Sequence, residues 1–153
     1  MTSLRWQPLT TLVLTILGVG VAAYLTVTHF DKQALACVSN STFNCEAVTT
    51  SPQSEILGIP VAMLGLAFFV PMIVLCLPVA WRTANRWVHL VRLAFSVIGV
   101  GMIVYLISAE LFTIKAVCLW CSGVHLLTFL LFVVIVTSAP IVLAPGYGTD
   151  PRA

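Results

Sequence analysis

Four long stretches without a charged residue dominate the sequence: residues 6–30, 56–81, 93–109 and 116–140. A helix needs about 20 residues to cross about 30 Å of hydrocarbon, and each stretch comes close to that length. The stretches are continuously apolar, whereas the strands of a membrane barrel alternate. We therefore predict an all-α membrane protein, a bundle of four transmembrane helices.

The predicted spans are residues 9–30, 59–79, 90–111 and 119–139, with a long loop between the first two. Only 8% of the residues are charged, against about 25% in soluble domains, so lipid is the expected solvent. The net charge of +2 and the lack of a basic cluster exclude nucleic acid as a partner. We expect a single domain, residues 1–153.

Basic residues are distributed unevenly between the two sides of the predicted membrane. One side has Arg5, Arg82, Arg86, Arg92 and Arg152, and the other has Lys32 and Lys115. The positive-inside bias then predicts a multi-pass protein of the inner (plasma) membrane with both termini in the cytoplasm and the long loop outside. This places Asp31, Glu46, Glu55 and Glu110 on the outward side, and Trp6, Trp81 and Trp87 in an aromatic belt at the inner interface.

Small residues in the spans predict close helix packing. Gly18 and Gly20 in the first span and Gly99 and Gly101 in the third are expected to let these two spans approach each other. Pro71 is expected to kink the second span, because proline removes a backbone donor.

Four of the five cysteines fall on the outward side, where disulfides persist: Cys37, Cys45, Cys118 and Cys121. Cys76 is alone near the inner end of the second span and is interpreted as a small membrane hydrophobe. No span carries a charged residue near its middle, which argues against an ion or proton transporter.

The motif Cys118-Leu119-Trp120-Cys121 opens the fourth span. Two intervening residues place both sulfurs on one helical turn, and the amides and dipole at a helix N-terminus favour a thiolate. This indicates a redox pair. Cys37 and Cys45 are either a structural staple of the loop or a pair that exchanges with the CxxC motif. Zinc is disfavoured because their spacing is not typical of its ligands, so no metal is expected.

His125 lies one helical turn after Cys121 on roughly the same face. It is either a packing residue or a group that polarises or protonates a bound carbonyl.

Together these motifs resemble the bacterial branch of the vitamin K epoxide reductase family. The similar features are the loop pair Cys37 and Cys45, then Ser51-Pro52, residues 56–60 entering the second span, and the CxxC motif of the fourth, and they extend over roughly residues 9–132. The DsbB family also has four spans and uses a quinone, but its CxxC motif comes before its spaced pair.

The resemblance implies a quinone-dependent thiol-disulfide oxidoreductase that supports disulfide formation outside the cytoplasm. A DsbA-like thioredoxin-fold partner would reduce Cys37–Cys45 through Cys37, Cys45 would attack Cys118, and Cys121 would face the quinone, either menaquinone or ubiquinone. By similarity, Ser51 and Ser54 would form hydrogen bonds with the quinone carbonyls. His125 occupies the position at which animal members have tyrosine. Since the chain ends soon after the fourth span, we expect no fused thioredoxin-like domain and a separate partner protein.

Two rival interpretations stay open. A non-catalytic membrane assembly subunit would use the same four cysteines in two structural disulfides, which resist mild reduction. A DsbB-like oxidase would perform the same net reaction on a different topology.

Overall fold

A computed structural model of the chain describes residues 6–31, 36–37 and 44–148. Arg5, Lys32 and Arg152, which the predicted orientation uses, lie outside these ranges.

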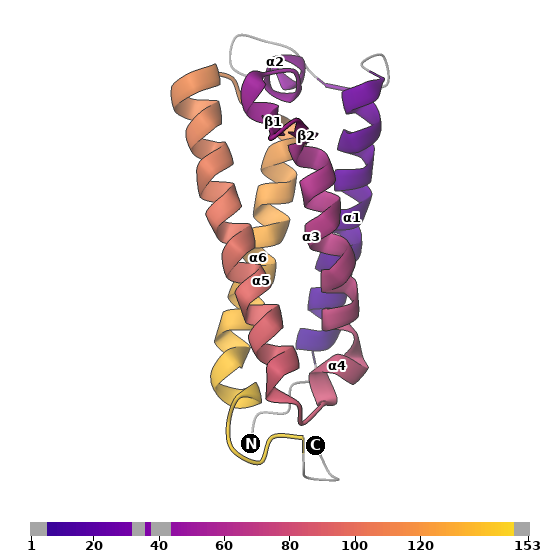
Figure 1. The fold of residues 1–153 in the computed structure, drawn as a ribbon. Helices are drawn as coiled ribbons and strands as arrows, with labels where there is room; N and C mark the ends of the chain where they lie inside the picture. Colours follow the sequence, from indigo (N-terminus) through magenta and orange to yellow (C-terminus); the bar gives the residue numbers. More distant parts are fainter. Residues whose placement is uncertain (1–5, 32–35, 38–43, 149–153) are drawn as a thin grey trace.

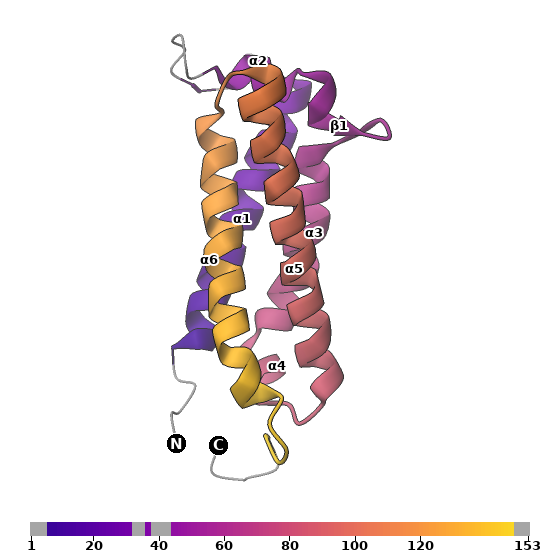
Figure 2. The same ribbon diagram turned by 90° about the vertical axis from the view of Figure 1, so that its left-hand side faces the viewer.

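Four helices run side by side along the bundle: α1 (Gln7–Phe30), α3 (Val61–Cys76), α5 (Arg86–Ser108) and α6 (Leu119–Val142) (Figure 1). Short elements join them: α2 (Cys45–Thr49), η2 (Pro52–Ser54), β1 (Glu55–Ile56), β2 (Ile59–Pro60), α4 (Pro78–Arg82) and the π-helical turn η3 (Ala109–Ile114). The strands β1 and β2 form an antiparallel hairpin, which projects sideways near the end of the bundle that carries α2, whereas α4 lies at the opposite end (Figure 2). The helical architecture expected from the apolar runs is confirmed.

Within the described residues, three helical segments are long and apolar enough to cross a membrane: Gln7–Phe30, Arg86–Ile114 and Leu119–Val142. The second predicted span is occupied by a shorter helix, α3, whose 16 residues extend over about 24 Å. Its end has a local cause, because Leu77 precedes Pro78 and adopts an extended ψ of 143°. The helix remains continuous through Pro71.

The bundle is held by helix pairs other than the one predicted from the glycines. α1 packs mainly against α3 and α6, and α5 packs mainly against α6. A Cβ on Gly18 would overlap the ring of Phe69 in α3, and one on Gly99 would press on Phe68 of the same helix. Gly18 and Gly99 therefore admit phenylalanine rings from α3, and the prediction that the glycines bring the first and third spans together is wrong.

The end of the bundle around α4 is closed by a buried arginine. Arg92 is 1% exposed, stacks 3.5 Å over the ring of Trp81, and donates to His89 Nδ1 at 2.8 Å. Trp81 is itself 1% exposed, so its assignment to an aromatic belt is wrong, whereas Trp6 and Trp87 are exposed. Because the guanidinium covers the indole face, this ring faces the protein interior instead of lipid.

Candidate functional site

The loop cysteines are bonded to each other beside the start of α6. Cys37 and Cys45 form a disulfide with a Cα–Cα distance of 6.1 Å. Cys45 begins α2, whose first turn is capped by the Asn44 side chain accepting from the amide of Ala47 at 3.0 Å. The backbone amide of Asn44 also donates to the carbonyl oxygen of Val117 at 3.2 Å, which joins this loop to the chain entering the CxxC motif.

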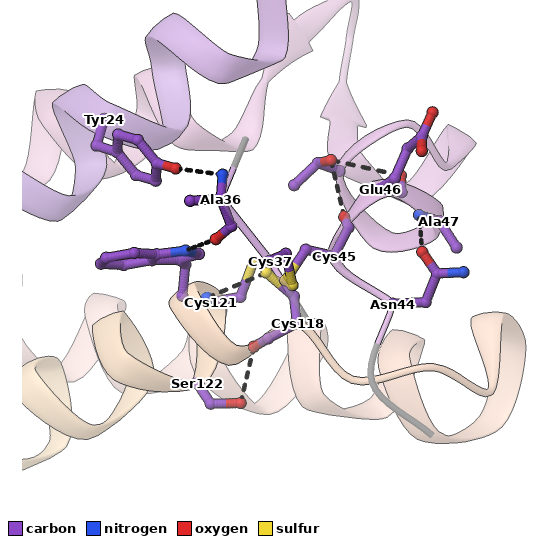
Figure 3. The surroundings of a disulfide bond; sticks show 12 residues. Tyr24, Ala36, Cys37, Asn44, Cys45, Glu46, Ala47, Cys118, Cys121 and Ser122 are labelled. Atoms are coloured by element: carbon purple, nitrogen blue, oxygen red, sulfur yellow. Dashed lines mark hydrogen bonds between the residues drawn. A yellow bond between two sulfur atoms is a disulfide. The ribbon is translucent and has the colours of Figure 1, made fainter. Parts of the chain in front are cut away.

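The CxxC cysteines are free thiols at the N-terminus of α6. Cys118 is the N-cap residue, and its sulfur accepts a hydrogen bond from the Cys121 amide at 3.3 Å. Cys45 and Cys118 are both completely buried in one cluster, against which Cys37 and Cys121 pack. Figure 3 shows the four side chains pointing toward one another, so the structure brings all four predicted cysteines together at one end of the bundle.

Cys118 has the electrostatic surroundings of a reactive thiol. The hydrogen bond with the Cys121 side chain lowers the pKa of the Cys118 thiol below its ordinary value, and the backbone amides of Cys121 and Trp120 act in the same direction. Burial and the nearby Glu110 carboxyl oppose this shift and are outweighed. Since the thiolate is the attacking form, Cys118 is prepared for exchange.

Two aromatic residues hold the backbone next to Cys37. The amide of Ala36 donates to the Tyr24 hydroxyl, and the indole of Trp120 donates to the Ala36 carbonyl oxygen, both at 2.8 Å. The two rings contact each other with centroids 4.8 Å apart. Both backbone groups of Ala36 are thus fixed by side chains from α1 and α6, which sets the position of Cys37 over the CxxC motif (Figure 3).

A cavity of about 400 Å³ lies between the helices next to Cys121 and is lined mainly by apolar side chains. Ser51, Ser54 and His125 also line it, so the structure places the three predicted carbonyl-binding residues around one space. The Ser51 hydroxyl donates to Val48 O at 2.8 Å, and the Ser54 hydroxyl donates to Ser51 O at 2.7 Å. A hydroxyl has one proton to donate, so either serine must give up its backbone bond before it can donate to a ligand.

The cavity is also lined by two titratable residues that were not predicted from the sequence as site residues. His29 lines it and pairs with Glu55, with 3.6 Å between Nε2 and Oε1. Glu110 lines it as well and is only 6% exposed. The available signal for Glu110 was a single carboxyl within an otherwise apolar helical stretch. Across the described ranges, no three His, Cys, Asp or Glu side chains are arranged to hold a metal ion.

A comparison with protein families finds one match. The family model described as the vitamin K epoxide reductase family matches residues 9–136, a range that includes all four clustered cysteines and the polar residues around the cavity. No protein with a curated description matches the sequence.

Proposed function

The chain belongs to the vitamin K epoxide reductase family, and on that premise we propose that it is a membrane oxidoreductase that carries electrons from protein thiols to a quinone. Family membership and three long apolar helices make it a membrane protein with a redox function. The proposal goes further: it assigns the electron donor, the acceptor and the path between them.

The observation that carries the proposal is the gathering of four sulfurs at the mouth of an apolar cavity. Cys45 and Cys118 are buried together, and Cys121 both packs on this cluster and lines the cavity. A relay through mixed disulfides needs sulfurs within reach of each other, and a quinone needs an apolar space next to the last of them. This arrangement meets both requirements.

The burial of the loop pair suggests the direction of the relay. Cys37 is half-buried whereas Cys45 is fully buried, so a partner dithiol would attack Cys37. The released Cys45 thiolate would attack Cys118 of an oxidised CxxC pair, and Cys121 would leave as a thiolate. The partner's second thiol would displace Cys37 and close the partner's own disulfide. Attack by the freed Cys37 thiolate on Cys45 would then restore the loop disulfide and leave two CxxC thiols. That final distribution is the one in the structure.

The cavity has the size and chemistry expected for a quinone ring. Its volume of about 400 Å³ falls within the range of small-molecule pockets, about 300–1,000 Å³. Ser51, Ser54 and His125 supply the few polar groups that would orient the two carbonyls of menaquinone or ubiquinone.

The proposed topology has four spans, with α3 as the second, and both termini in the cytoplasm. The cysteine cluster then lies outside, where a separate thioredoxin-fold protein of the DsbA type would deliver electrons. Trp6, which precedes α1, and Trp87, in the first turn of α5, are exposed and support an inner interface at the opposite end from the sulfurs. The free thiols of Cys118 and Cys121 favour this relay over an assembly subunit with two structural disulfides.

The test is a quinone-reduction assay on the purified protein in lipid, with a reduced thioredoxin-fold dithiol protein as electron donor. The wild type and Cys76→Ser should consume quinone at similar rates, because Cys76 is buried in the helical core away from the cluster. Cys118→Ser and Cys121→Ser should each lose turnover. Undiminished rates in both CxxC variants would reject the proposed reaction.

A further inference from the structure

Glu110 is a buried carboxyl group in an apolar wall. Its neighbours Leu111 and Phe112 are 55% and 79% exposed, whereas Glu110 is 6% exposed and lines the cavity. The residue belongs to η3, a π-helical turn that continues α5. Such turns are frequent at functional sites, and this one directs a carboxyl inward from a segment whose next two residues are exposed.

The carboxyl of Glu110 shares the cavity with the CxxC motif. Glu110 and Cys121 both line it, and the carboxyl interacts electrostatically with the thiols of Cys118 and Cys121. Within the described residues no lysine or arginine forms an ion pair with it. A buried carboxyl without a cation is costly, and a salt bridge therefore does not explain why it is there.

We propose that Glu110 is the proton carrier of the CxxC thiols, moving a proton between them and the ligand in the cavity. This inference rests on the proposed function. In one turnover the two thiols lose two electrons and two protons as the Cys118–Cys121 bond forms. The electrons reduce the quinone, and both protons end on its two oxygens. Glu110 takes one of these protons from a thiol, releases it to a quinone oxygen, and returns to its starting form.

Other titratable groups line the same cavity as Glu110. His125 and Cys121 face it from α6, and His29 faces it from α1, paired with Glu55 of the hairpin. α3 contributes only apolar side chains to the cavity. Cys45, the first residue of α2, is bonded to Cys37 in a disulfide and has no thiol proton. A bell-shaped rate profile alone would not single out Glu110, so the test compares variants of that residue.

The experiment uses the full chain in lipid with a small membrane-permeant dithiol as donor, which bypasses the protein partner. Glu110→Gln keeps the side-chain size and one carbonyl oxygen but cannot carry a proton. It should lower kcat about tenfold or more, with KM for the quinone changed less than about twofold. Glu110→Asp should recover part of kcat. The matched control is Glu46→Gln, an exposed carboxyl at the same end of the bundle, which should keep the wild-type kcat.

A second readout does not require turnover. The Glu110 carboxylate raises the pKa of the Cys118 thiol, so Glu110→Gln should move the midpoint of Cys118 alkylation to lower pH, whereas Glu46→Gln should leave it in place. A Glu110→Gln protein with wild-type kcat and an unmoved midpoint overturns the inference and leaves the proposed function intact. A wild type that reduces no quinone rejects the proposed function, and this inference with it.

Discussion

The backbone amide of Asn44 donates a hydrogen bond to the carbonyl oxygen of Val117 at 3.2 Å. Asn44 directly precedes Cys45 and Val117 directly precedes Cys118, so this single bond aligns the two completely buried cysteines of the cluster. The order of sulfur exchange that we propose depends on this alignment.

Weakening the cap of α2 should slow exchange between the two cysteine pairs. Asn44→Ala removes the side-chain acceptor of the Ala47 amide, at a cost of about 1 kcal/mol, which corresponds to about a fivefold slower transfer. Rapid-mixing measurements of thiol release at Cys118 and Cys121 after addition of a reduced partner would detect this change.

The control for that variant is Asn85→Ala. Asn85 caps α5 in the same way, accepting from the Trp87 amide at 3.0 Å, but it lies at the other end of the bundle. It should leave the transfer rate unchanged. Equal slowing by both variants would mean that general destabilisation, and not the alignment of Cys45, sets the rate.

Cys37 should be required for quinone reduction only when the electron donor is a protein. Cys37→Ser should lose quinone reduction with a thioredoxin-fold partner, because the half-buried sulfur that receives the attack is gone. It should keep activity with a small membrane-permeant dithiol that reduces the CxxC pair directly. Loss of activity with both donors would contradict the contact role of Cys37.

The Cys118 thiol should ionise at lower pH in the folded protein than in the unfolded chain. Its pKa is lowered chiefly by the hydrogen bond with the Cys121 side chain, so the thiolate persists at pH values where an ordinary thiol is protonated. Alkylation of Cys118 followed by mass spectrometry across a pH series should give the lower midpoint in the folded state. Cys121→Ala should raise that midpoint, and an unmoved midpoint would show that another group stabilises the thiolate.

Gly18 should be essential for packing α1 on α3. Gly18→Ala places a methyl group in the ring of Phe69 and should destabilise the fold by about 1–3 kcal/mol, measured as a lower thermal unfolding midpoint in detergent. Gly20→Ala is the matched control, because nothing lies within 4 Å of its added methyl. Equal midpoints for the two variants would show that the Phe69 ring moves aside without cost.

The sequence was sufficient to predict a helical membrane protein with a redox motif, because apolar runs and a CxxC at a helix start are local signals. The sequence also contains the signal for the end of α3, because a helix usually ends at or before the residue that precedes a proline, here Pro78. The close packing of Gly18 was anticipated, but its partner was not, because a glycine does not specify which helix approaches it.

The features that were missed depend on tertiary contacts or on a change of helical period. Trp81 is buried because Arg92 stacks on it from another helix. Tyr24 serves the site through a hydrogen bond with Ala36, which no pattern in the sequence reveals. Glu110 points inward because η3 departs from the α-helical period, so an analysis based on that period cannot orient it.

The most direct measurement of the relay is a non-reducing peptide map of the Cys121→Ser protein. In this variant the Cys118 thiolate can attack Cys45 and release Cys37, which reverses the last exchange step of the relay, but no Cys121 thiol is present to displace Cys118 from the mixed disulfide. A Cys45–Cys118 bridge should therefore accumulate together with a free Cys37 thiol. The Cys45→Ser, Cys121→Ser double variant is the control and should lack that bridge. An unbroken Cys37–Cys45 disulfide in Cys121→Ser, or a bridge between Cys37 and Cys118, would contradict the exchange path proposed for this protein.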